Sequence, residues 1–226
     1  MIADNAYVAR RLQMSGEWDA ALAALGPDVE PELRAEIAVD RWFFQMEGHE
    51  EAEKAVAALD PASPIAHLLT ARLAYSRLLF QRDPRTDDRA VAEAGYRAAV
   101  ETGDEKQRAW AEYHWAVLLD NIDEDPAGAL PLYETALEVA TKYGDGYFES
   151  YIIRHLAPHK EPAERMSMLR RSLHLRAALG ARPQAIAAQA LLAENLPAGD
   201  PERAELTRTF RPGAEELRIG WLRPED

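Results

Sequence analysis

Apolar residues recur at helical spacing along most of the chain, three or four positions apart, which places them on one face of an α-helix. Two such sets are Leu130, Tyr133, Leu137, Ala140 and Met166, Leu169, Leu173, Arg176, the last through its aliphatic stem. No stretch shows the alternation that is typical of strands. Alanine, leucine, glutamate and arginine, which favour helices, dominate between the breaks. The pattern predicts an all-α protein.

The breaks between these stretches are marked by acid–proline dipeptides and by glycines. An acidic side chain at a helix start accepts hydrogen bonds from free amides, and proline at the first helical position needs no N–H. Glycine tolerates the left-handed conformation that often follows the last turn. We predict twelve helices, near residues 4–15, 17–25, 31–47, 49–59, 63–82, 86–102, 105–121, 126–143, 145–157, 161–179, 183–196 and 200–219. Their short connections favour six antiparallel hairpins.

Small and aromatic residues recur at a fixed offset. The three equivalent sets are Ala92, Tyr96, Ala99, then Ala129, Tyr133, Ala136 after 37 residues, then Arg165, Leu169, Ser172 after another 36. In the preceding helices, Leu73 and Trp110 are also 37 residues apart. Small residues let two helices approach closely, and the aromatic ring fills the space between hairpins. The recurrence predicts a helical repeat, clearest over residues 63–180.

This pattern resembles the tetratricopeptide repeat (TPR), which has a Trp early in its first helix and an Ala-x3-aromatic-x2-Ala set in its second. Trp110 and the set around Tyr133 match it, and the run from Gly16 to Ala21 resembles the turn of that family. His114 departs from the pattern, because it stands where the family usually has glycine. The resemblance implies one TPR-like domain over residues 1–226, a right-handed superhelical array of about six hairpins.

In such arrays the first helix of each repeat lines a concave face. Carrying the family's groove positions across gives Ala71, Ala74, Leu78, Gln81, Arg82, Arg108, Ala111, Trp115, Leu118, Leu119, Asp145, Phe148, Ile152, His155 and Leu156. We predict that the groove binds its ligand or peptide through Gln81, Arg82, Arg108, Trp115, Phe148 and His155. The sequence leaves open whether these apolar positions form a groove or ordinary buried core.

Charge and composition narrow the classes of partner. The formal net charge is −13, from 39 acidic and 26 basic residues, which disfavours binding to nucleic acid. The arginines from Arg165 to Arg176 are interpreted as a solvated helix face. The chain has no cysteine, no signal-peptide pattern at its start and no apolar run long enough to span a bilayer. We therefore expect a cytoplasmic protein without membrane contact.

Candidate metal and catalytic motifs are weak. His155 and His159 are four residues apart, but Pro158 between them disfavours a continuous helix, and a zinc site needs further ligands. The acidic turn from Asp120 to Asp125 lacks the glycine and final glutamate of a calcium-binding loop. No nucleophile elbow, phosphate-binding glycine loop or dinucleotide fingerprint is present. The sequence predicts no metal and no cofactor.

The sequence favours a non-enzymatic scaffold that binds a protein or peptide in its groove, with Arg82, Arg108 and Arg154 contacting an acidic peptide. The alternative is an enzyme or small-molecule-binding protein, in which the array curls to close a pocket around His114, Trp115 and His155. A third hypothesis is a homodimer in which the tail residues Leu217, Ile219, Trp221 and Leu222 dock on a second copy.

Overall fold

The computed structural model describes residues 5–26 and 30–222, and within these ranges it contains helices and no strand. The helices are α1 (Asn5–Ser15), α2 (Trp18–Leu25), α3 (Pro31–Gln45), α4 (His49–Ala57), α5 (Pro64–Phe80), α6 (Asp88–Thr102), α7 (Glu105–Asn121), α8 (Pro126–Tyr143), α9 (Gly146–Leu156), α10 (Pro162–Leu179), α11 (Arg182–Asn195) and α12 (Pro201–Glu216). Two short 3₁₀ helices, η1 (Ala157–His159) and η2 (Gly220–Leu222), complete the described chain. The twelve predicted helices are confirmed. The largest difference is at the last one, predicted to end at residue 219 and observed to end at 216.

Side-chain caps explain why several helices begin where the sequence predicted. Asp104 accepts hydrogen bonds from the first free amides of α7, and Gln107 accepts one from the amide of Asp104 in return. Asp125 caps α8 and Asp200 caps α12, each followed by proline at the first helical position. Glu161 precedes Pro162 in the same way but makes no capping hydrogen bond. The acid–proline signal therefore located the breaks, although the caps themselves differ in chemistry.

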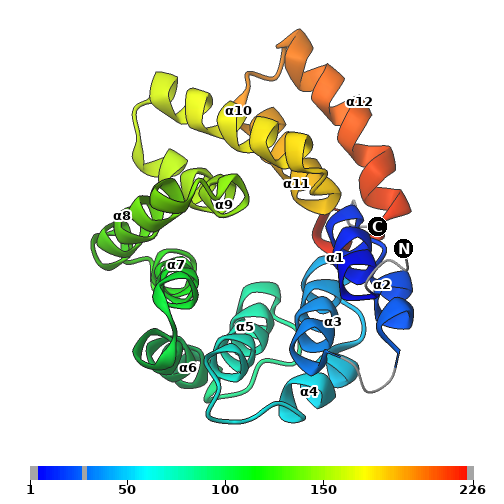
Figure 1. Ribbon diagram of the computed structural model, residues 1–226. Helices are drawn as coiled ribbons and strands as arrows, with labels where there is room; N and C mark the ends of the chain where they lie inside the picture. The colour runs from blue at the N-terminus through cyan, green and yellow to red at the C-terminus, as the bar shows by residue number, and fades with distance from the viewer. Residues whose placement is uncertain (1–4, 27–29, 223–226) are drawn as a thin grey trace.

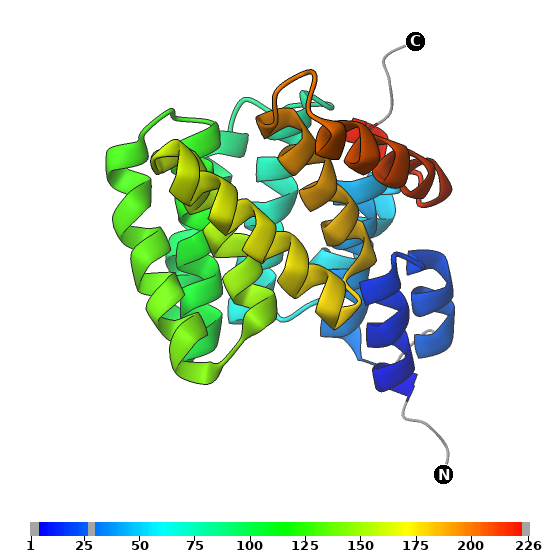
Figure 2. The same cartoon turned by 90° about the horizontal axis from the view of Figure 1, so that it is seen from above.

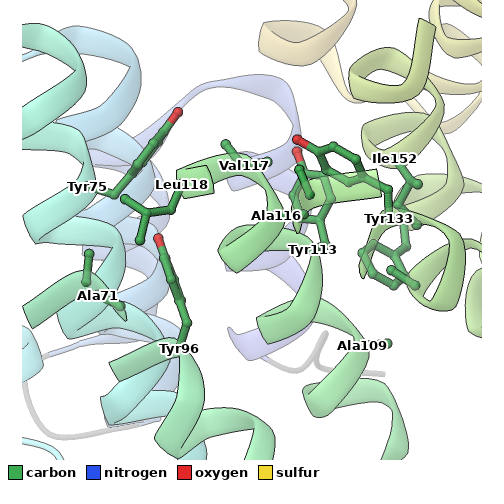
Figure 3. Packing of buried hydrophobic residues seen from close by; sticks show 14 of the residues in the cluster. Ala71, Tyr75, Tyr96, Ala109, Tyr113, Ala116, Val117, Leu118, Tyr133 and Ile152 are labelled. Carbon is green, nitrogen blue, oxygen red and sulfur yellow. The ribbon is translucent and has the colours of Figure 1, made fainter. Parts of the chain in front are cut away.

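Consecutive helices pack against each other along the chain, and the recurring residues lie where they meet. Tyr96 and Tyr133 are fully buried, each between two buried alanines of its own helix, as the repeat predicted. Figure 3 shows both rings within the core formed by α5 to α9. At Gly95 a Cβ atom would lie only 2.8 Å from the backbone oxygen of His67, so α5 and α6 approach too closely for a larger residue. The TPR-like superhelix itself stays a prediction.

The helices are arranged as a ring, which Figure 1 shows along its axis. Helix α11 contacts α1, and η2 contacts α3, so the end of the chain returns to its beginning. Figure 2, the same cartoon seen from above, shows α12 and α11 beside the N-terminal hairpin α1–α2. None of the described helices is long and apolar enough to cross a membrane.

The ring is closed by the segment that follows α12. Leu217 and Ile219 are buried in one hydrophobic cluster with Trp18 and Phe44, which lie about 200 and 170 positions earlier in the chain. The buried amide of Gln45 donates a hydrogen bond to the carbonyl oxygen of Leu217 over 3.1 Å. This closure adds the hydrophobic contribution of two buried aliphatic side chains, about 1.5–3 kcal/mol each.

Two further features fit the closing segment to the N-terminal helices. Gly16 has φ +86° and leaves room for Leu217, whose Cδ1 would be 2.8 Å from a Cβ atom at that position. The ring of Trp221 lies 6.3 Å from Phe44 and 6.5 Å from Phe43, measured between ring centroids. In this conformation the apolar tail therefore packs against its own chain. The homodimer hypothesis instead placed it on a second copy.

Candidate functional site: the central cavity

A cavity of about 370 Å³ lies at the centre of the ring, bounded by α3, α5, α7, α9, α10, α11 and η2. Its wall consists of Phe43, Phe44, Arg72, Tyr75, Ser76, Leu79, Phe80, Tyr113, His114, Val117, Asn121, Tyr151, Arg154, His155, Arg176, Gln184, Ala187 and Trp221. Among the residues that the structure describes, the wall is aromatic and cationic and contains no aspartate or glutamate. Elements far apart in sequence thus contribute to one site.

Three arginines from three helices reach the cavity, and only one has an acidic partner. Arg72 on α5 donates a hydrogen bond to Asp40 over 2.8 Å. Burial opposes the charge of Arg72, but the carboxylate of Asp40 outweighs it and raises the pKa of Arg72. Within the described chain, no carboxylate lies at ion-pair distance from Arg154 or Arg176. The cavity wall therefore carries two uncompensated positive charges in a protein whose net charge is −13.

Arg176 is the more deeply buried of these two, with 2% of its surface exposed. Its guanidinium donates to the hydroxyl and carbonyl oxygens of Ser150 and to the carbonyl oxygen of Gln184, at 3.0–3.3 Å. It also lies over the ring of Tyr151, 4.9 Å from the centroid. Burial, and then the charge of Arg154, lowers the pKa of Arg176 to about 10. These neutral acceptors hold the side chain in place without neutralising it.

Arg154 and His155 are adjacent on α9 and form a direct contact. Nη1 of Arg154 lies 2.9 Å from Nε2 of His155. A guanidinium can only donate, so Nε2 accepts and the imidazole carries its proton on Nδ1. Burial, followed by the charges of Arg154 and Arg176, lowers the pKa of His155 well below its usual range. His155 is therefore a neutral imidazole at physiological pH.

His114, on α7, is the second neutral imidazole of the wall. It stacks on the ring of Tyr96, with centroids 6.0 Å apart, and on Trp110, at 5.9 Å. Burial lowers the pKa of His114 well below its usual range, and the charge of Arg72 lowers it further. The residue that departs from the TPR pattern thus occupies the cavity wall.

Phenol groups form a second polar layer around the arginines. Asn121 donates to the hydroxyl of Tyr75 over 2.7 Å, and burial raises the pKa of Tyr75 to about 12. Tyr151 and Tyr147 share a hydrogen bond of 3.1 Å, and Gln184 donates to Tyr147 at the same distance. Burial also raises the pKa of Tyr147. The hydroxyl of Tyr75, which lines the cavity, stays protonated at physiological pH and can donate a hydrogen bond to a ligand as well as accept one.

Another part of the wall is apolar. Phe43 packs against both Phe80 and Trp221, with ring centroids 5.3 and 6.5 Å away. Leu79 and Val117 extend this surface. The cavity can accordingly hold a molecule with one polar or charged end and one apolar end.

Three buried polar atoms of the wall have no hydrogen-bond partner among the described residues. They are Nε of Arg154, Nε1 of Trp221 and Oε1 of Gln184. An unpaired buried N–H or C=O group costs roughly 1–3 kcal/mol, and more when the group is charged. Six further buried side-chain atoms of the described chain, outside the wall, are unpaired in the same way, so this feature by itself does not distinguish the cavity.

A second hollow, of about 690 Å³, lies between α4, α5 and α6. Its charged side chains pair with each other: Arg77 donates to Asp88 and Glu53, and Arg85 also donates to Glu53. None of its lining residues has an unpaired buried polar atom. The larger hollow therefore lacks the features that distinguish the central cavity.

The structure brings only one of the six predicted groove residues into the cavity wall, namely His155. Gln81 and Arg82 are exposed after the end of α5, and Arg108 is exposed on α7. Trp115 lies under Arg97, whose Cζ is 4.6 Å from its ring centroid. Phe148 is buried against Trp110, with centroids 4.1 Å apart. Of the alternative pocket around His114, Trp115 and His155, the two histidines line the cavity.

On α5, the residues that line the cavity are one position away from those that the TPR resemblance implied. On α5 the wall uses Arg72, Tyr75, Ser76 and Leu79, where Ala71, Ala74 and Leu78 were expected. One residue corresponds to about 100° around a helix. Four of the expected positions of α5 and α7, namely Ala71, Ala74, Ala111 and Leu118, are instead buried between helices. The open choice between groove and core is thus resolved as core for these residues.

Sequence reasoning missed Arg72, Arg176 and the C-terminal Trp221 as parts of one site. Arg176 carried a usable signal, because it occupies the apolar stripe of α10. The interpretation of the arginines of α10 as a solvated face is wrong for Arg176, and it holds for the exposed Arg170 and Arg171. Arg72 and Trp221 had no comparable signal, because their place depends on ring closure.

The residues of the two candidate metal motifs have other roles in the structure. His159 lies in η1, with Nε2 3.2 Å from a carboxylate oxygen of Asp120, while His155 faces the cavity. Asp125 of the acidic turn caps α8. In the part of the chain that the structure describes, no three His, Asp or Glu side chains are grouped as metal ligands would be.

Comparisons of the chain with protein-family models, with curated proteins and with solved structures find no match.

Proposed function

We propose that the protein binds a small molecule in its central cavity. The observation that carries this proposal is the cavity formed by ring closure, whose described wall combines aromatic side chains with Arg154 and Arg176, two arginines that have no acidic partner there. Its volume of about 370 Å³ lies within the range of roughly 300–1,000 Å³ that is usual for small-molecule sites. A mainly apolar wall with a few convergent polar groups is typical of such sites.

The peptide-binding scaffold predicted from the sequence has less support. Of the residues expected to contact a peptide, Arg82 and Arg108 are exposed away from the wall that contains Arg154.

The proposal is tested with the neutral dye N-phenyl-1-naphthylamine, whose fluorescence rises in apolar sites. We expect saturable binding of one dye per chain. Ala187→Phe and Val117→Phe each fill the cavity from a different helix and should abolish this binding. The matched control is Ala178→Phe, because Ala178 is exposed on α10 and outside the wall. Circular dichroism establishes that each variant remains folded.

Two results would contradict the proposal. One is the absence of saturable dye binding to the folded wild-type protein. The other is binding that persists unchanged in both filling variants while they remain helical, because the dye would then occupy another surface.

A further inference from the structure

We infer that the ligand of the central cavity is an amphiphilic anion: an acid group bound by Arg154 and Arg176, and an apolar or aromatic body held against the phenylalanines and Trp221. This inference rests on the proposed small-molecule site and specifies the class of ligand. Carboxylates, phosphate monoesters and sulfonates share the required chemistry, since each presents several anionic oxygens to a guanidinium.

The charges of the described cavity wall do not balance. Arg72 is neutralised by Asp40, and both histidines are neutral. Asp120, a carboxylate near this region, accepts from Tyr133 and lies 3.2 Å from His159. The charges of the half-buried Arg154 and the buried Arg176 therefore remain, and a charge withdrawn from water without a counter-ion is unfavourable. An anion in the cavity would supply the missing charge.

The two guanidiniums retain hydrogen-bond donors. Three of the five N–H groups of Arg176 are used by Ser150 and Gln184, which leaves two. Arg154 donates from Nη1 to His155, and its Nη2 has no acceptor among the described residues. Donors remain on both side chains, and the described wall has no carboxylate to accept from them.

The apolar surface and the two arginines belong to different segments of the ring. Phe43, Phe44 and Trp221 come from the two segments that close the ring, whereas Arg154 and Arg176 come from α9 and α10. A ligand with an acid group at one end and a ring or alkyl chain at the other would contact both. A small inorganic anion alone would leave the aromatic surface without a partner.

The experiment compares two dyes that share one aromatic skeleton. The probe 1-anilinonaphthalene-8-sulfonate carries a sulfonate, and N-phenyl-1-naphthylamine lacks it. We expect the wild-type protein to bind the sulfonate at least tenfold more tightly. Arg154→Met and Arg176→Met should each weaken the sulfonate about tenfold or more, as expected for a lost hydrogen bond to a charged group. They should change the affinity for the neutral dye less than twofold.

Control variants distinguish a local effect of the cavity arginines from a general effect of the protein's net charge. Arg170→Met changes the net charge equally on the same helix as Arg176, but Arg170 is exposed and pairs with Glu202. It should leave the sulfonate affinity unchanged within twofold. Arg154→Lys keeps the charge and should retain most of the affinity for the sulfonate. This result would show that the loss in Arg154→Met does not come from misfolding. Competition by 1-naphthaleneacetate and by 1-naphthyl phosphate then distinguishes a carboxylate from a phosphate ligand.

The outcomes are distinct. If the neutral dye binds in the cavity and the sulfonate binds no better, the small-molecule site stands and the anion inference is overturned. The anion inference is equally overturned if Arg170→Met weakens the sulfonate as much as Arg154→Met does, or if neither acid competes. If neither dye binds, both proposals fail together.

Discussion

Closure of the ring by the segment after α12 can be tested with one core substitution. Ile219 is fully buried in a cluster that joins α1, α2, α3 and α11. Ile219→Ala removes three carbons from this cluster, and such truncations cost about 2–5 kcal/mol. Even the lower value changes the equilibrium between the closed and opened segment by a factor of about 30. Ile219 is not part of the cavity wall, so the effect reports on closure.

The assay is native-state amide hydrogen exchange, followed region by region. In a closed ring, Ile219→Ala should speed exchange in α2 (Trp18–Leu25) and α3 (Pro31–Gln45) as well as in α12, because these helices share the disturbed cluster. In an open array, repeats contact only their neighbours, and the effect would stay at the C-terminal end. The two arrangements thus predict different exchange in helices that are distant in sequence.

Leu192→Ala provides the matched control. Leu192 is 1% exposed on α11 and packs with Ala157, Leu169 and Leu196, without the N-terminal helices. It should lower the global stability by a similar amount without a selective effect on α2. Unchanged exchange in α2 of the Ile219→Ala protein, beside a clear opening of α12, would refute the closed ring in solution.

Two further predictions concern charged and titratable groups. Because burial keeps the cavity histidines neutral, the unfolded chain binds more protons than the fold below pH about 6.5, and the free energy of unfolding should fall there by up to ~1.4 kcal/mol per pH unit per histidine. Urea titrations at pH 7 and pH 5 should show a shallower loss for His114→Gln and an unchanged one for the exposed His174→Gln; equal slopes in all three proteins would contradict this. Asp88→Asn leaves Arg77 buried without the carboxylate that it binds through Nε and Nη2, so we expect a loss of about 3 kcal/mol in denaturant unfolding. The exposed Asp87→Asn should cost less than about 0.5 kcal/mol, and similar losses in both variants would exclude a special role for the buried pair.

The inward face of each helix could be predicted only in part. Of the alternative pocket that the sequence offered, His114 and His155 line the cavity. Trp115, beside His114 in the chain, faces Arg97 on the neighbouring helix α6. Periodicity shows that a helix has a buried side, but the rotation of that side follows from packing against both neighbours. A shift of about 100° therefore changed which residues met in the centre of the ring.

The sequence by itself determined the helices and their order. Acid–proline pairs, glycines and apolar spacing act within a few residues, and capping by Asp104, Asp125 and Asp200 shows the same local physics in the structure. The recurrence around Tyr96 and Tyr133 likewise identified the positions that are fully buried. These signals are readable because each depends on neighbours in the chain.

Only the tertiary structure decided that the array closes and surrounds a cavity. Closure joins Leu217 and Ile219 to Trp18 and Phe44, and no local pattern specifies a contact across such a separation. The same contact brings Trp221 into the wall opposite the helices that carry the unpaired arginines. A site assembled from both ends of the chain is set by the summed geometry of all the hairpins between them, which no single segment encodes.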